Sequence, residues 1–269
     1  MTTSLPPDFA DWLRLREPAD AAARSTELAD AVRDRLPADR PLVVHDLGSG
    51  TGSMARWLAP RLPGPQHWVL HERDADLLAL AGAGPLTAAD GGPVTVTTRG
   101  SDITRLTAAD LADAHLVTAS ALLDMLTAEE IDRMAAACAG RPTLFALTVL
   151  GRAEFTPAHP LDAELTDAFN AHQRRTVDGR VLLGPDAADA TVAAFARHGV
   201  EVTVRSTPWR LGPERAALAA EWLAGWVDAA VEERPHLAGP AATYRKWRLA
   251  EAAAGRLEVV LHHADLLAG

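Results

Sequence analysis

The sequence predicts an α/β fold built on one doubly wound, mostly parallel sheet of seven strands. Short apolar runs, such as residues 42–44 and 143–150, alternate with segments whose apolar residues recur at helical spacing. The first apolar run ends in Asp46, and three glycines follow at alternate positions, Gly48, Gly50 and Gly52. A glycine-rich turn between a buried strand and a helix forms a nucleotide pocket at the carboxyl end of the strand.

Composition limits the class of protein. The chain has 269 residues, 48% of them hydrophobic, which suits one large α/β domain with additions. Its net charge of −10 disfavours binding to nucleic acid. No apolar run approaches the roughly 20 residues that span a bilayer, so we expect no membrane segment. The N-terminus lacks the pattern of a signal peptide and Cys138 is the single cysteine, so we expect a cytoplasmic protein.

Residues 1–40 are expected to form a helical cover that precedes the core. Apolar residues fall on one helical face over residues 9–16 and again over residues 28–36, and Pro37 closes the second helix. The core is expected to span residues 41–212.

The spacing of the three glycines decides between nucleotide loops. Ser53 stands where the dinucleotide fingerprint G-x-G-x-x-G needs its third glycine, and no lysine follows as the P-loop requires. The stretch from Asp46 to Gly52 resembles instead the first motif of the class I S-adenosylmethionine-dependent methyltransferases, in which an apolar strand leads to an acidic residue and G-x-G-x-G. This resemblance is strongest over residues 41–150.

The resemblance implies a Rossmann-like methyltransferase fold with S-adenosyl-L-methionine as cofactor and S-adenosyl-L-homocysteine as product. It places part of the cofactor against the glycine loop, which includes Asp46, Gly48, Ser49, Gly50 and Gly52.

The ends of the next two strands supply further candidates for the cofactor site. Glu72 ends a predicted strand over residues 67–71 and lies 20 residues beyond Gly52, the position of an acidic residue that accepts hydrogen bonds from ribose hydroxyls. Arg73 adjoins it. The resemblance assigns Asp102 to the adenine amino group and Ile103 to the face of the ring. Glu72 as an exposed strand end, and Asp102 as a turn or N-cap residue, are the alternatives.

The segment after a fourth predicted strand, residues 115–119, lies over the transferable methyl group in the resembling family. Ser120 is expected to line the cofactor. The absence of Asn-Pro-Pro-Tyr here disfavours methylation of nucleobase amino groups or glutamine amides. Asp124 is a candidate general base or a solvated helix residue. His172 is a candidate base, because its pKa suits proton abstraction near neutral pH, or a structural histidine. Arg24 either reaches the methionine carboxylate or is solvated on a helix.

Residues 213–254 form a predicted helical insertion, a lid or a dimer contact, in which Trp222 and Trp226 are interpreted as packing anchors. Residues 255–269 hold the last strand of the core, expected to be antiparallel. His262 and His263 are neighbours on this strand and point to opposite faces, so they are not expected to share a metal ion.

The predicted function is methyl transfer from S-adenosylmethionine to a small molecule, in bacterial biosynthetic metabolism. Lys246 is the only lysine, which together with the alanine bias suggests a GC-rich genome. Three alternatives are open: a domain that binds the cofactor without methyl transfer, methylation of RNA or protein, and a nicotinamide dehydrogenase. The chain is expected to be a monomer or a homodimer. The sequence does not identify the acceptor molecule or the atom that is methylated.

Overall fold

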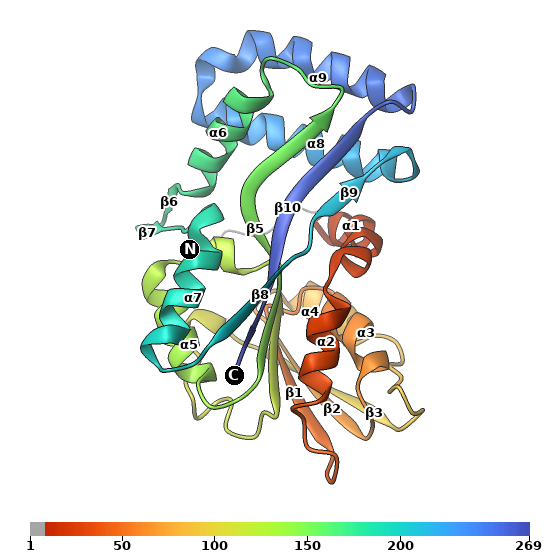
Figure 1. The fold of residues 1–269 in the computed structure, drawn as a ribbon, viewed down its shortest axis with the longest axis vertical. Coiled ribbons are helices and arrows are strands. Elements are labelled where there is room, and N and C mark those ends of the chain that lie inside the picture. Colours follow the sequence, from red (N-terminus) through yellow and green to blue (C-terminus); the bar gives the residue numbers. More distant parts are fainter. Residues whose placement is uncertain (1–8) are drawn as a thin grey trace.

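The computed structural model describes residues 9–269, which form a central sheet flanked by helices (Figure 1). The strand order is β3-β2-β1-β4-β5-β10-β8, with β9 paired to the outer half of β10. Strands β1 to β5 are parallel, and β10 runs antiparallel to its three neighbours. The strand bounds are β1 (Leu42–Leu47), β2 (Gln66–Glu72), β3 (Val94–Gly100), β4 (Leu116–Ser120), β5 (Thr143–Thr156), β8 (Val202–Ser206), β9 (Trp209–Leu211) and β10 (Glu258–Ala268).

The predicted fold class is confirmed, with one additional short strand. The sheet has eight strands rather than seven, because the chain turns back after β8 and lays Trp209–Leu211 beside β10. A strand of three residues is too short for a period-2 pattern to reveal it. A separate hairpin, β6 (Thr176–Val177) and β7 (Arg180–Val181), was also not predicted.

Helices cover both faces of the sheet (Figure 1). One hydrophobic core joins α2 and α3 to the sheet, and a second joins α5 and α7 to the opposite face. The helix bounds are α1 (Phe9–Ala23), α2 (Thr26–Arg33), α3 (Ser53–Leu58), α4 (Ala75–Ala81), α5 (Ala128–Cys138), α6 (Asp162–Gln173), α7 (Ala187–Arg197), α8 (Ala216–Glu233) and α9 (Ala238–Ala253).

Local sequence explains where several helices begin and end. Asp74 caps α4 by accepting hydrogen bonds from two backbone N–H groups. Thr127 and Glu130 form the reciprocal capping box that starts α5. Pro60 ends α3 at Leu58 and lies in the short 3₁₀ turn that follows, since proline cannot donate the next helical hydrogen bond.

The long strands β5 and β10 extend beyond the rest of the sheet and carry a second lobe (Figure 1). β5 continues six residues past its predicted end at Leu150, through Gly151, whose φ is +66°. Helices α6, α8 and α9 pack on this extension, and Phe155, Trp226 and Tyr244 are buried between them. The helical insertion after residue 213 is thus part of the second lobe, and Trp226 is a packing anchor as interpreted.

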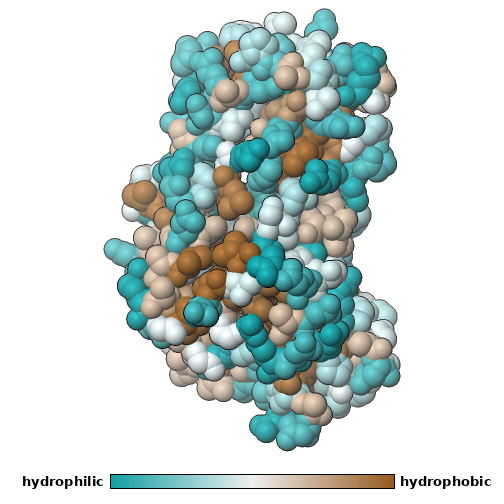
Figure 2. Space-filling model, in the orientation of Figure 1, coloured by the Kyte–Doolittle hydropathy of each residue, from teal (hydrophilic) through white to brown (hydrophobic). Residues whose placement is uncertain are grey.

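The surface gives two further observations. In Figure 2 the visible face is mostly hydrophilic, with hydrophobic residues gathered near its middle. Over residues 9–269, no helix has both the length and the apolar character needed to cross a bilayer.

Candidate functional site

A cavity of about 340 Å³ lies at the carboxyl ends of β1, β2, β3 and β4. This is the edge of the sheet at which open α/β folds bind ligands. Helix α1 closes it from the other side with Phe9, Trp12 and Leu13. The lining includes these predicted site residues: Asp46, Gly48, Ser49, Gly50, Glu72, Arg73, Asp102, Ile103, Ser120 and Asp124.

The glycine loop that follows β1 forms one wall of the cavity. Gly48 and Gly50 have φ values of +64° and +53°, a conformation that favours glycine. A Cβ on Gly48 would lie 3.0 Å from Leu122 Cδ1, and a Cβ on Gly50 would lie 3.3 Å from Leu13 Cδ1. The loop therefore brings bare backbone to the cavity. Gly52 does not line it and begins α3 with a φ of +83°.

Glu72, at the end of β2, holds this loop in place. Its Oε2 accepts a hydrogen bond from the Gly50 N–H at 3.0 Å, and its Oε1 accepts from the N–H groups of Arg73 at 2.8 Å and Asp74 at 3.1 Å. A carboxylate oxygen has two lone pairs, so Oε2 can accept one more hydrogen bond from a ligand. Glu72 thus orders the loop and also faces the cavity.

Asp46 is a lining residue of the same cavity and has a buried oxygen without a hydrogen-bond partner among the described residues. Its side chain is buried, and its Oδ1 accepts a hydrogen bond from the Thr118 hydroxyl at 2.7 Å. Its Oδ2 is buried and has no hydrogen-bond partner among the described residues, and the same is true of Ser49 Oγ. Burial raises the pKa of Asp46 to about 7, and the Thr118 hydrogen bond and the Arg24 charge oppose that shift. Buried polar atoms without partners fit a ligand that supplies hydrogen-bond donors or positive charge.

Arg24 lies behind the cavity wall and does not line it. Its guanidinium donates hydrogen bonds to Ser53 Oγ at 3.0 Å and to Ser120 Oγ at 2.9 Å, and both serines line the cavity. Arg24 is itself buried. The structure therefore excludes solvation on a helix face and places Arg24 where it positions Ser120 rather than where it meets a ligand directly.

Asp102 lines the cavity and also caps a short 3₁₀ turn. Its Oδ1 accepts hydrogen bonds from the Thr104 N–H at 3.0 Å and the Thr104 hydroxyl at 2.7 Å. The turn places Ile103 beside it in the lining. The N-cap role and a ligand contact are thus compatible.

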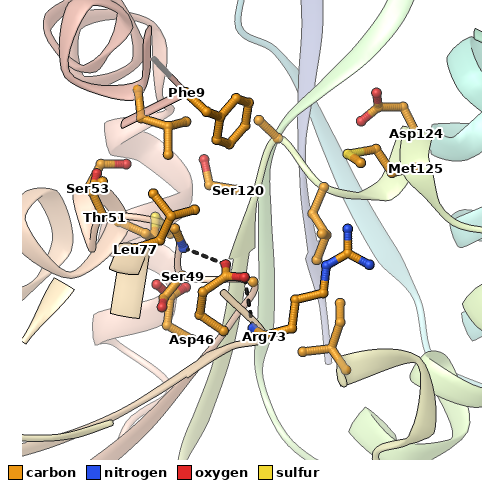
Figure 3. Close-up of a pocket in the computed structure, with 18 of the residues that line it drawn as sticks. Phe9, Asp46, Ser49, Thr51, Ser53, Arg73, Leu77, Ser120, Asp124 and Met125 are labelled. Atoms are coloured by element: carbon orange, nitrogen blue, oxygen red, sulfur yellow. Dashed lines mark hydrogen bonds between the residues drawn. The ribbon is translucent and has the colours of Figure 1, made fainter. Parts of the chain in front are cut away.

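The two candidate bases lie in different places. Asp124 lines the cavity on a short 3₁₀ turn after β4, near Met125 (Figure 3). Burial raises the pKa of Asp124, although the Arg16 and Arg175 charges oppose the shift. His172 is not in the cavity lining. It lies on α6 in the second lobe, where its Nε2 is 3.4 Å from Glu232 Oε2 on α8.

Sequence reasoning missed a polar cluster at the α1 side of the cavity. Arg16 pairs with Asp20 at 3.0 Å, and its guanidinium lies 4.8 Å from the ring centroid of Trp209. The indole N–H of Trp209 donates to Asp20 at 3.0 Å. The helical spacing of Trp12 and Arg16 indicated the face of α1. Nothing in the sequence indicated that Trp209 of β9 would meet it.

Arg180 was also missed. It reaches the cavity from the β6–β7 hairpin and forms an ion pair with Glu130 at 2.6 Å. Its pairing joins residues 50 positions apart, which no local pattern predicts.

The described part of the chain holds no group of three or more His, Cys, Asp or Glu side chains arranged to bind a metal ion. His262 Nε2 lies 2.9 Å from Glu154 Oε1, and His263 is buried beside Trp209.

No family model matches the sequence, and no curated protein matches it. The chain is similar to several solved structures. One is the cyclopropane synthase MmaA2 from Mycobacterium tuberculosis, at 12% identity and a TM-score of 0.48, over 96% of this chain and 94% of that chain. Another is a SAM-dependent methyltransferase from Geobacter sulfurreducens in complex with S-adenosyl-L-homocysteine, at 16% identity and a TM-score of 0.46, over 98% of each chain.

A third is a SAM-dependent methyltransferase from Thiobacillus denitrificans, also in complex with S-adenosyl-L-homocysteine. It is 16% identical with a TM-score of 0.45, over 98% of this chain and 99% of that chain.

Proposed function

We propose that the chain is an S-adenosylmethionine-dependent methyltransferase that acts on a small molecule. The observation that supports this most directly is the union of three features in one cavity. They are the strand-Asp-G-x-G-x-G loop, the acidic end of the next strand at Glu72, and the buried carboxylate of Asp46. The G-x-G-x-G loop alone is common, but this combination suits an adenosine ligand that also carries positive charge.

The residues at the ends of β2 and β3 would hold the nucleoside part of the cofactor. Glu72 has one lone pair on Oε2 free to accept from a ribose hydroxyl. The glycine loop lets the ligand approach the backbone, because no side chain at Gly48 or Gly50 intervenes. Asp102 would accept from the amino group of the base, and Ile103 would pack on the ring.

The residues at the ends of β1 and β4 would hold the charged part. When bound, S-adenosylmethionine supplies a methyl group on a sulfonium that is already an activated electrophile. The chain's own task is therefore alignment and exclusion of water. Asp46 provides a carboxylate for a cationic ligand. Arg24 orients the Ser120 hydroxyl through a 2.9 Å hydrogen bond.

Asp124 is the residue we propose as general base for acceptors that must lose a proton. It faces the cavity, and its raised pKa makes its carboxylate a stronger base than an exposed aspartate. His172 is not proposed for this role, since it lies outside the cavity lining. A small acceptor is supported by the closure of the cavity by α1 and by the net charge of −10, which disfavours RNA.

Calorimetry with S-adenosylhomocysteine tests the cofactor assignment. We expect binding to the native chain and a loss of affinity on the order of tenfold to a hundredfold in Glu72→Ala, since a charged hydrogen bond is removed. Both Glu72 oxygens accept from backbone N–H groups, so thermal unfolding of Glu72→Ala is measured beside its binding to separate this loss from disorder of the loop. Glu129→Ala, an exposed carboxylate on α5, is the matched control and should bind as the native chain does. Absence of binding to folded native protein contradicts the proposal, and tight binding of NAD instead would favour a dehydrogenase.

A further inference from the structure

Four polar side chains form a continuous chain from the protein surface to the cavity. Asp113 Oδ1 lies 3.1 Å from His45 Nε2. His45 Nδ1 lies 3.0 Å from His71 Nε2, and His71 Nδ1 lies 2.9 Å from Ser101 Oγ. Ser101 lines the cavity next to Asp102. This series of four side chains thus begins before β4, crosses β1 and β2, and ends just after β3.

The two histidines in the middle are neutral. The His45 and His71 side chains are 0% and 1% exposed, whereas the Asp113 side chain is 60% exposed. Burial lowers the pKa of His71 to about 4, with contributions from His45 and Arg99. Burial also lowers the pKa of His45, which Asp113 opposes and Arg99 reinforces. A neutral imidazole donates from one ring nitrogen and accepts at the other. The tautomer of one ring therefore determines the direction of the next hydrogen bond in the series.

The carboxylate of Asp113 sets that direction. It is only an acceptor, so His45 Nε2 must carry its proton, because a lone pair facing the carboxylate at 3.1 Å would be repelled. His45 Nδ1 then accepts from His71 Nε2–H, and His71 Nδ1 accepts from the Ser101 hydroxyl. The contact of Asp113 with His45 is a close approach and not a well-aligned hydrogen bond. The negative charge of Asp113, rather than the geometry of a hydrogen bond, therefore selects the tautomer of His45 that is protonated on Nε2.

This direction fixes what Ser101 offers to a ligand. Its proton is committed to His71 at 2.9 Å, and the other acceptor near it among residues 9–269, the Arg99 carbonyl, is at 3.5 Å. Only oxygen lone pairs of Ser101 remain to face the cavity.

We propose that Ser101 determines specificity at the nucleoside end of the cavity, where its hydroxyl accepts a hydrogen bond from an exocyclic amino group and disfavours a carbonyl at that position. The ligand class is a purine nucleoside with a 6-amino group, and its 6-oxo counterpart is the disfavoured class. Asp113, His45 and His71 act as positioning residues through Ser101. The inference rests on the proposed function, because it assumes an adenosine ligand in this cavity.

The ratio of two dissociation constants tests the role of Ser101. The ligands are S-adenosylhomocysteine and its 6-oxo analogue, S-inosylhomocysteine. The native chain should favour the first, and Ser101→Ala should reduce that preference on the order of tenfold, the value of one lost hydrogen bond with a mismatched partner. An unchanged ratio in Ser101→Ala overturns the proposal. If neither ligand binds to folded protein, the proposed function itself fails, and the inference fails with it.

Reversal of the charge at Asp113 tests the direction of the hydrogen bonds along the four side chains. In Asp113→Lys the ammonium is only a donor, so His45 Nε2 would accept and every proton along the chain would move to the other side. Ser101 would then accept from His71 and donate its proton into the cavity, so the preference should shift toward S-inosylhomocysteine. Asp110→Lys is the matched control. It makes the same charge change near His71, but Asp110 bonds to Thr107 and does not contact any of the four side chains. If the ratio of the two dissociation constants is the same in Asp113→Lys and Asp110→Lys, the inference is contradicted.

Long-range ¹H–¹⁵N spectra of the full native chain provide a test that needs no ligand. We expect His45 and His71 each to carry a proton on Nε2 and none on Nδ1. Both should change tautomer in Asp113→Lys and neither in Asp110→Lys. A proton on Nδ1 of either ring in the native chain overturns the proposed direction, whatever the outcome of the binding experiments.

Discussion

The unpaired, buried carboxylate of Asp46 makes cofactor affinity depend on pH. Its pKa is raised to about 7, mainly by burial, so a large fraction of the native chain carries a neutral Asp46 near neutral pH. If the bound cofactor places positive charge beside this group, only the ionised form binds well. We therefore expect affinity for S-adenosylmethionine to rise as pH rises through about 7.

The size of the effect follows from the titration. With a pKa of about 7, Asp46 is roughly one-tenth ionised at about pH 6 and roughly nine-tenths ionised at about pH 8. Affinity should thus increase about tenfold over this interval, or roughly 1.4 kcal/mol of binding free energy. Asp46→Asn keeps an oxygen that can accept from Thr118 but cannot ionise, so it should bind weakly and without this rise.

Calorimetry at a series of pH values measures the effect. The amino group of the cofactor also titrates, near the pKa of about 8 of an α-amino group. The readout is therefore the difference between the native and Asp46→Asn curves, in which this common contribution cancels. The folded pKa of Asp46 is above its ordinary value, so the carboxylate destabilises the native state as pH rises, and Asp46→Asn should remain folded above pH 7. Parallel curves for the two proteins would refute the assignment of Asp46 to a cationic ligand.

Three further predictions concern stability and reactivity. Since burial lowers the pKa of His71 from 6.5 to about 4, the unfolded state binds more protons in this window. Stability should be full above pH 6.5 and should fall by ~3 kcal/mol toward pH 4, with a smaller fall in His71→Gln, as measured by urea unfolding. Arg248→Met should lower the free energy of unfolding by on the order of 3 kcal/mol, because it leaves the partly buried Asp162 carboxylate without its guanidinium, whereas Arg14→Met, at the pair with Asp11 in which both side chains are exposed, should cost almost nothing. Burial raises the pKa of Cys138 to about 12, so a thiol reagent should label it only at the rate of unfolding, and rapid labelling of native protein would contradict its burial.

Much of the fold could be predicted because the signals are local. Strand β1 is buried and ends in a glycine loop, Thr127 and Glu130 lie three residues apart in a capping box, and Pro60 ends a helix. Each pattern lies within one turn or one strand. Glu72 was chosen for its spacing of 20 residues after Gly52 and Asp102 for its match to the resembling family, and both residues line the cavity.

The parts that the sequence did not reveal depend on contacts between distant segments. The extension of β5 beyond Leu150 alternates polar and apolar residues, which is a strand pattern, but it begins at Gly151, and the sequence does not reveal its pairing with β10. Arg24 was expected either to reach the methionine carboxylate or to be solvated on a helix, yet it is buried and donates hydrogen bonds to Ser53 and Ser120, which line the cavity. His172 was a candidate base because of its residue type, but the placement of α6 in the second lobe keeps it outside the cavity lining. A residue's chemistry can be inferred from its type, whereas its neighbours depend on the whole fold.

The chain of Asp113, His45, His71 and Ser101 is the clearest example of such a distant arrangement. The members come from four separate segments, and no spacing in the sequence links them. The register of β1 against β2 places His45 Nδ1 3.0 Å from His71 Nε2.

The structure of the chain in complex with S-adenosylhomocysteine is the most direct test of the central claim. The account predicts that the ligand lies in the cavity at the carboxyl ends of β1 to β4, with its ribose at Glu72, its base at Ser101 and Asp102, and its amino-acid part toward Asp46 and Ser120. A ligand bound elsewhere, or a cavity that stays empty at saturating ligand concentration, would contradict it.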